Sequence, residues 1–189
     1  HMSVTGEEQK YVKEAFDTNW VVPLGPNVNG FETDLKYYVS DPDDGTDLQK
    51  EVVALSAGTA AVHLALLACG VGPGDEVCVQ SFTFCASSHP ITYLGATPVF
   101  IDSERDTWNM DPELLEKAII DRKEKTGKYP KAIVPVALYG MPYDCERIMT
   151  IANKYGIPVV EDAAEGFGSR YKGRVLGTFG KFGVLSFNG

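Results

Sequence analysis

Several features that assign other proteins to a class are missing from this 189-residue sequence. It has neither a G-x-G-x-x-G fingerprint nor a G-x-x-x-x-G-K-[ST] loop, so the usual dinucleotide-binding and P-loop signatures are absent. No apolar run approaches the roughly 20 residues that a membrane-spanning helix needs, and the start has no signal-peptide pattern. We therefore expect a cytoplasmic protein, and we interpret His1-Met2 as the remnant of a cleaved tag.

Positive charge is also scarce. The 17 Lys and Arg residues stand against 26 Asp and Glu residues, which gives a formal net charge of −9. This balance argues against a nucleic acid or an anionic membrane as the main partner, because both carry negative charge.

Cysteine and histidine are few and show no metal-binding spacing. There is no C-x-x-C pair, so we expect reduced thiols at all four cysteines, which are Cys69, Cys78, Cys85 and Cys145. His63 and His89 each fall in an expected helix without a second ligand at metal spacing. We interpret both as packing residues and expect no metal site.

What the sequence does contain is a regular alternation of strand and helix patterns. Apolar and β-branched runs predict strands at 51–55, 76–80, 98–101, 132–136 and 158–161. Helical spacing predicts the intervening helices at 59–69, 84–94, 112–125 and 144–154. Strands that alternate with helices of this length indicate βαβ units, hence a three-layer α/β fold with a mostly parallel sheet and helices on both faces.

The flanks of this region follow a different pattern. Two helices are expected ahead of it, at 5–19 and 31–39, and the stretch 41–47 between them and the first strand is acidic and turn-rich. After it, the glycine-punctuated segment from Gly166 onward predicts short strands at 169–175 and 183–187.

The strand at 158–161 ends on two carboxylates, Glu161 and Asp162. In an open parallel sheet the carboxyl ends of the strands line the ligand crevice, so Asp162 is a candidate for a charge that faces a ligand. The small residues Ala163 and Ala164 would allow a flat ring to approach closely. The residues alone leave open a second interpretation, in which Asp162 only caps the following turn.

Two other strand ends carry residues of complementary chemistry. Gly58, Thr59 and Ala60 open a helix, where free backbone N–H groups favour a phosphate, although such residues also serve as a plain cap. Phe82 and Phe84 follow the next strand. Their rings form an aromatic plate, a flat surface on which a planar cofactor can stack, or they are simply core residues. A phosphate cradle, an aromatic plate and a carboxylate on one rim form the set that a phosphorylated pyridine ring needs.

A series of motifs in order gives these residues a common interpretation. The sequence resembles the DegT/DnrJ/EryC1/StrS family of pyridoxal-phosphate-dependent aminotransferases acting on nucleotide-linked keto sugars, from about Tyr11 to its last residue. The motifs that carry the resemblance are Ser56-Ala57-Gly58-Thr59-Ala60-Ala61, Gly72-Pro73-Gly74-Asp75-Glu76-Val77, Ser81-Phe82-Thr83-Phe84, Gly95-Ala96-Thr97-Pro98-Val99-Phe100, Leu138-Tyr139-Gly140, Glu161-Asp162-Ala163-Ala164 and Gly168-Ser169-Arg170-Tyr171-Lys172-Gly173.

The resemblance implies a role for each candidate residue. Asp162 would pair with the protonated pyridine nitrogen, and Phe84 would stack on the ring of pyridoxal phosphate. Glu165 occupies the position where many relatives carry Gln or His, which would place it near the ring hydroxyl. The phosphate would be bound by Gly58, Thr59 and Ser186, and Asn188 is the last expected cofactor contact.

The resemblance also implies a substrate and an assembly. The Asp162 motif and the ending Ser186-Phe187-Asn188-Gly189 look most like aminotransferases of bacillosamine-type glycan biosynthesis. These aminate the C4 keto group of a UDP-linked 4-keto-6-deoxy amino sugar, with glutamate as donor. The family's active sites lie at a dimer interface, so we expect a homodimer of the full-length protein, in which 19–29 contributes to substrate binding.

The sequence departs from the family pattern in three places. Ala137 stands where many relatives have His, and the acidic stretch 41–47 lengthens the lead into the first strand. The Schiff-base lysine is not present, because the family register places it just after Gly189, and Lys172 and Lys181 do not match its position. We therefore expect residues 1–189 to be the N-terminal part of a type I aminotransferase large domain, truncated ahead of the small C-terminal domain and inactive alone.

Two alternatives remain open from the sequence. One is a dehydratase of the same family, in which a histidine replaces the lysine and the sugar is deoxygenated. The other is a non-catalytic α/β domain that binds a nucleotide sugar or a partner protein.

Overall fold

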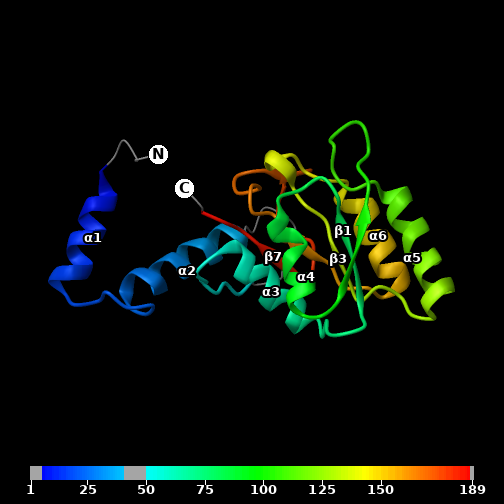
Figure 1. Ribbon diagram of the computed structural model, residues 1–189. Helices are drawn as coiled ribbons and strands as arrows, with labels where there is room; N and C mark the ends of the chain where they lie inside the picture. Colours follow the sequence, from blue (N-terminus) through cyan, green and yellow to red (C-terminus); the bar gives the residue numbers. More distant parts are fainter. Residues whose placement is uncertain (1–5, 41–49, 188–189) are drawn as a thin grey trace. The chain divides into compact units, whose positions relative to one another are not determined.

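The computed structural model describes residues 6–40 and 50–187, which fall into two compact units (Figure 1). The described part of the first unit holds α1 (Glu7–Asp17), α2 (Pro26–Val39) and the segment that leads up to Ala54. Both helices expected there are confirmed, with α2 starting earlier than predicted because Pro26 suits the first helical turn.

The strand expected at 51–55 is wrong, since the described residues there form no strand. This segment is fixed within the first unit by side chains instead of by a neighbouring strand. The Ala54 N–H donates to the Glu32 carboxylate at 2.8 Å, and Lys36 pairs with Glu51 at 2.7 Å.

The second unit contains the parallel sheet. Strand β1 (Glu76–Gln80) lies between β2 (Thr97–Ile101) and β3 (Ala132–Val134), and β4 (Val160–Asp162) pairs with β7 (Phe182–Val184), all in parallel. Single parallel bridges from Ile133 to Val159 and from Val136 to Asp162 join these groups, which places β4 next to β3. The expected strand at 132–136 is interrupted because Pro135 has no N–H to donate to the ladder.

Helices cover the sheet on both sides, as predicted. Along β1, Val77 and Val79 pack into the cluster that contains Leu66 of α3 (Gly58–Ala68) and Ile91 of α4 (His89–Tyr93). Cys78 points the other way, toward α5 (Pro112–Thr126) and α6 (Cys145–Tyr155). Alternation along a strand thus divides the core into two layers.

The helix expected at 84–94 is divided into η2 (Cys85–Ser87) and α4. A continuous helix would need a backbone N–H at Pro90, which proline lacks. The helices α5 and α6 match the prediction, and Asp111 caps α5 by accepting the N–H groups of Glu113 and Leu114. None of the helices in the described ranges is long and apolar enough to cross a membrane.

Beyond the sheet, the glycine-rich end of the chain forms a small hairpin. Strands β5 (Arg170–Tyr171) and β6 (Arg174–Val175) pair in antiparallel fashion. Earlier in the chain, the short turn η3 (Leu138–Gly140) follows β3. Strand β7 ends at Val184, so Ser186 and Phe187 lie just past its carboxyl end rather than inside the predicted strand.

Candidate cofactor site

Asp162 is the last residue of β4 and is 6 % exposed. The Ser87 hydroxyl donates to its Oδ2 at 2.5 Å, and the Ala164 N–H donates to its Oδ1 at 3.2 Å. Burial raises the pKa of this carboxyl, these two hydrogen bonds oppose the rise, and the charge of Glu165 adds to it. Asp162 therefore does bind the following turn, but the turn occupies only part of its acceptor capacity.

The two ends of the second unit's sequence meet at Gly58. A Cβ atom at this position would lie 3.3 Å from the Ser186 Cβ and 3.4 Å from its Oγ. Gly58 is the first residue of α3, and its N-cap Ala57 supplies no side-chain hydrogen bond. The structure thus brings together Gly58 and Ser186, with Thr59 in the same first helical turn, where backbone N–H groups have no intrahelical acceptor.

Phe84 is not a core residue. Its side chain is 76 % exposed, and it directly precedes η2, which carries Ser87. Phe82 is partly exposed and meets Trp108 edge to face, with ring centroids 6.1 Å apart. An exposed ring on the segment whose hydroxyl bonds Asp162 is therefore available to a planar ligand.

Glu165 is exposed and has a structural contact that the sequence did not indicate. Its Oε2 accepts the backbone N–H of Tyr139 at 2.5 Å. Tyr139 has φ +52°, which places a non-glycine residue in the left-handed region, and its side chain is 80 % exposed. The contact anchors η3, next to the buried Ala137. Asn188, the last expected cofactor contact, lies outside the described residues.

Sequence reasoning missed the function of Glu161, the neighbour of Asp162. Glu161 is fully buried, and its two oxygens accept the N–H groups of Gly177 at 3.1 Å and Gly180 at 2.5 Å. Burial raises the pKa of this carboxyl, and these backbone bonds oppose the rise. Its position one residue before Asp162 was the available signal, because alternation along a strand sends the two side chains to opposite faces.

Ser87 and Thr83 were also missed. Their hydroxyl oxygens lie 2.8 Å apart, and Ser87 in turn bonds Asp162. No spacing rule links residue 87 to residue 162, so only the fold reveals this contact. Lys172, which does not match the family's lysine position, is engaged in an ion pair with Glu146 at 2.6 Å.

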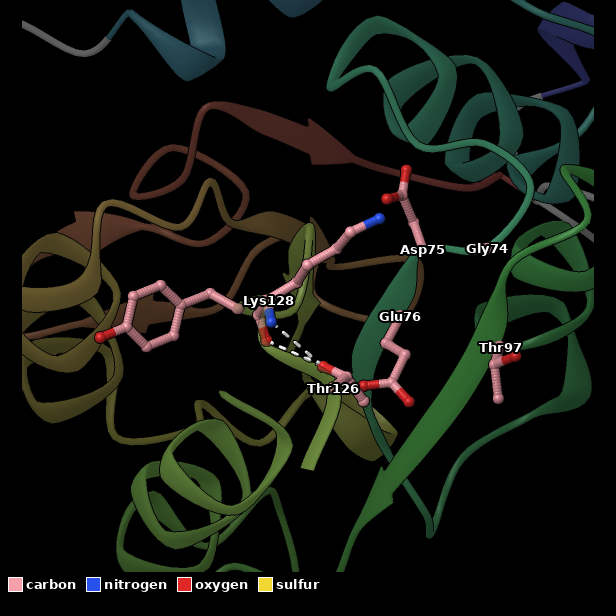
Figure 2. A pocket seen from close by; sticks show the side chains of 7 residues that line it. Gly74, Asp75, Glu76, Thr97, Thr126 and Lys128 are labelled. Carbon is pink, nitrogen blue, oxygen red and sulfur yellow. Dashed lines mark hydrogen bonds between the residues drawn. The ribbon is translucent and has the colours of Figure 1, made fainter. Parts of the chain in front are cut away.

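A shallow pocket of about 180 Å³ lies at the opposite end of the sheet (Figure 2). Glu76 and Thr97, the first residues of β1 and β2, line it together with Asp75, Lys128 and others. The Glu76 carboxylate is already engaged by two nitrogens of Arg122, at 2.8 and 2.9 Å. Since ligands of parallel sheets bind at the carboxyl ends of the strands, this pocket is not the predicted site.

Comparisons with known proteins support one family. Residues 3–189 match the model of the DegT/DnrJ/EryC1/StrS aminotransferase family. A putative pyridoxal phosphate-dependent aminotransferase EpsN of Bacillus subtilis is 50 % identical over the whole chain, which covers 46 % of that protein. A GDP-perosamine synthase of Escherichia coli O157:H7 is 41 % identical over 99 % of the chain and 47 % of the relative.

A third relative, a UDP-2-acetamido-2-deoxy-3-oxo-D-glucuronate aminotransferase of Pseudomonas aeruginosa, is 44 % identical over 80 % of the chain and 38 % of its own length. The chain therefore spans about half the length, or less, of the curated relatives it matches.

Solved structures agree with the fold. An aminotransferase from Psychrobacter cryohalolentis superposes with a TM-score of 0.80 at 35 % identity, over 94 % of this chain and 42 % of that one. The pyridoxal phosphate form of a putative sugar aminotransferase from Streptococcus pneumoniae gives a TM-score of 0.73 at 32 % identity, over 92 % and 46 % of the two chains. The chain belongs to the DegT/DnrJ/EryC1/StrS aminotransferase family.

Proposed function

We propose that this chain is the cofactor-binding part of a pyridoxal-phosphate-dependent aminotransferase that acts on a nucleotide-linked keto sugar. The observation that carries the proposal is the rim of the second unit. There a buried carboxylate ends a central strand, a helix start without a side-chain cap meets Ser186, and an exposed aromatic ring precedes the residue bonded to that carboxylate.

The residues on this rim fit the three parts of the cofactor. The first turn of α3, with Gly58, Thr59 and the neighbouring Ser186, would hold the phosphate, because the Cβ that glycine lacks would fill the space beside Ser186. Phe84 would cover one face of the ring. When bound, the cofactor supplies an electron sink for a carbanion at the reacting carbon.

Asp162 would hold a proton on the ring nitrogen. A buried carboxylate without a cationic partner is costly, which is why burial raises its pKa in the ligand-free chain. A protonated ring nitrogen offsets that cost by pairing with it. The same low exposure keeps water from screening the pair. Glu165 would stand near the ring hydroxyl while it anchors Tyr139.

The proposal extends to the identity of the substrate, the amino donor, the assembly and the location of the full-length enzyme. We infer a UDP-linked 4-keto-6-deoxy amino sugar as acceptor, glutamate as amino donor, a homodimeric full-length enzyme and a cytoplasmic location. The motif of Asp162 through Gly166 supports the sugar class. Relatives named for UDP-linked and GDP-linked sugars support a nucleotide-linked one.

The first test is cofactor binding by the chain itself. Equilibrium dialysis with pyridoxal phosphate should give saturable binding that Gly58→Val and Asp162→Asn each weaken at least about tenfold. Gly58→Val fills the proposed phosphate space beside Ser186, and Asp162→Asn removes the charge opposite the ring nitrogen. Asp121→Asn, the same chemical change on the surface of α5, should bind like the wild type. A wild-type chain that binds no tighter than Gly58→Val would contradict the proposal.

The second test concerns the longer protein. Incubated with glutamate and a UDP-linked 4-keto-6-deoxy amino sugar, it should yield a product that carries nitrogen from ¹⁵N-glutamate at C4, detected by mass spectrometry. The matching GDP-linked sugar serves as the comparison. A deoxygenated product without ¹⁵N would instead support the dehydratase alternative.

A further inference from the structure

Three oxygens form a chain that ends at Asp162. The Thr83 hydroxyl lies 2.8 Å from the Ser87 hydroxyl, and the Ser87 hydroxyl lies 2.5 Å from Oδ2 of Asp162. Ser87 is 1 % exposed and Asp162 is 6 % exposed, so bulk water does not compete for the Ser87 contact. The two hydroxyls belong to a segment far from Asp162 in the sequence.

The direction of each bond follows from the number of hydrogens. An ionised carboxylate only accepts, so the single hydroxyl hydrogen of Ser87 goes to Asp162. Ser87 then has no hydrogen left for Thr83, and the Thr83 hydroxyl must be the donor in their contact. The chain therefore runs from Thr83 to Ser87 to Asp162, and each bond polarises the next toward the negative charge.

The hydrogen bonds that Asp162 already accepts show how much acceptor capacity remains for a further donor. Ala164 occupies Oδ1 through its N–H, and Ser87 occupies Oδ2. A carboxylate offers about four lone-pair sites, so an incoming N–H donor still finds an acceptor. The negative charge of Glu165 acts on Asp162 and disfavours its ionised form.

We propose that Ser87, oriented by Thr83, is a positioning residue that fixes the Asp162 carboxylate for a cationic ring nitrogen. This inference rests on the proposed function, because the nitrogen belongs to the proposed cofactor. Phe84, the proposed ring plate, lies between the two hydroxyl residues in the sequence. One short segment therefore sets both the plane of the ring and the orientation of the charge opposite its nitrogen.

The variants are chosen to separate orientation from simple folding. Ser87→Ala removes the hydroxyl, Ser87→Thr restores it, and Thr83→Val keeps the shape of Thr83 without a donor. Thermal unfolding followed by circular dichroism is run on each variant. Thr83→Val keeps the test decisive if Ser87→Ala folds poorly, because it too should raise the pKa of Asp162.

The first measurement uses the ligand-free chain and needs no cofactor. The pKa of Asp162 is followed by ¹³C NMR of the carboxyl carbon across a pH series. Loss of a donor to the ionised form should raise this pKa in Ser87→Ala, raise it less in Thr83→Val, and leave it near the wild-type value in Ser87→Thr. An unchanged pKa in Ser87→Ala would overturn the proposal.

The second measurement compares two ligands, pyridoxal phosphate and its analogue with carbon in place of the ring nitrogen. Ser87→Ala should weaken binding of pyridoxal phosphate about tenfold, as expected for a hydrogen bond to a charged group, and leave the analogue unaffected. Equal weakening of both ligands would indicate a structural role and overturn the proposal. A wild-type chain that binds neither ligand would instead overturn the proposed function, and with it the purpose assigned to Ser87.

Discussion

The two faces of strand β4 carry adjacent buried carboxylates with opposite surroundings. Glu161 faces the α5–α6 side, where Gly177 and Gly180 direct backbone N–H groups at both of its oxygens. Asp162 faces the other side, where one hydroxyl and one N–H bond it and acceptor capacity remains. Burial raises the pKa of both groups, so burial alone does not distinguish a structural acid from one that we propose to bind a ligand.

The two carboxylates differ in the groups that donate hydrogen bonds to them. The partners of Glu161 are fixed parts of the fold, because they belong to the turn that leads into β7. That turn is tight, since a Cβ at Gly183 would lie 1.9 Å from the Gly177 carbonyl oxygen. Asp162 receives one hydrogen bond from the Ser87 side chain and one from the Ala164 backbone and, in our proposal, also pairs with a ligand.

The largest effect is expected from Glu161→Ala. The change leaves two buried N–H groups without an acceptor and opens a cavity, so the free energy of unfolding should fall by about 4 kcal/mol. Glu161→Gln keeps the volume and one acceptor oxygen and should lose about half as much. Urea denaturation measures both, and a loss below about 1 kcal/mol for Glu161→Ala would show that Glu161 is not a structural anchor.

Asp162→Asn should have the opposite effect on stability. It removes a buried charge whose raised pKa shows that the ionised form destabilises the ligand-free fold, so the free energy of unfolding at neutral pH should rise. Affinity for pyridoxal phosphate should fall in the same variant. A variant with both lower stability and lower affinity would contradict this prediction, because Asp162 would then stabilise the fold as Glu161 does.

The pH dependence of stability sharpens this contrast. The folded pKa of Asp162 is raised above the unfolded value of about 3.9, so the wild type retains the contribution of this group below that pH and loses it as the pH rises through the folded pKa. The stability advantage of Asp162→Asn should therefore be absent near pH 3 and grow with pH. Glu161 titrates in both proteins and cancels in the difference, which denaturation at a series of pH values measures.

The smallest effect is expected from Glu165→Gln. Glutamine can still accept the Tyr139 N–H, so the free energy of unfolding should change by less than about 0.5 kcal/mol. The loss of its negative charge should lower the pKa of Asp162, because the Glu165 charge contributes to the rise. ¹³C NMR of the Asp162 carboxyl checks the direction, and an unchanged value would show that solvent screens the Glu165 charge.

Much of the fold was predictable because local pattern and burial agreed. The bounds of β1 matched, and Asp111 capped α5 as expected, since both depend on neighbouring residues. The prediction of a strand at 51–55 was wrong because an apolar run does not reveal whether a partner strand lies beside it. The prediction of one continuous helix at 84–94 was wrong because of Pro90. This helix-breaking residue is visible in the sequence, but the prediction gave more weight to the helical periodicity.

The candidate site was predictable only in part. Strand-end position identified Asp162, and a glycine at a helix start identified Gly58, because both follow from chain geometry. The contacts of Ser87 with Asp162, of Glu165 with Tyr139, and of Glu161 with the turn before β7 join residues distant in sequence. Such contacts depend on tertiary packing, which no local pattern encodes.

The meeting of Gly58 with Ser186 has a consequence for biosynthesis. Gly58 leaves the ribosome early, while Ser186 follows only after the parallel strands found in the described residues have been made. Domains fold largely as units during synthesis, and contacts between distant residues form late. The contact between Gly58 and Ser186 would therefore form only when β7 joins the sheet. The phosphate site that we propose at these two residues would then be completed after the sheet has formed, rather than serve as a nucleus for its folding.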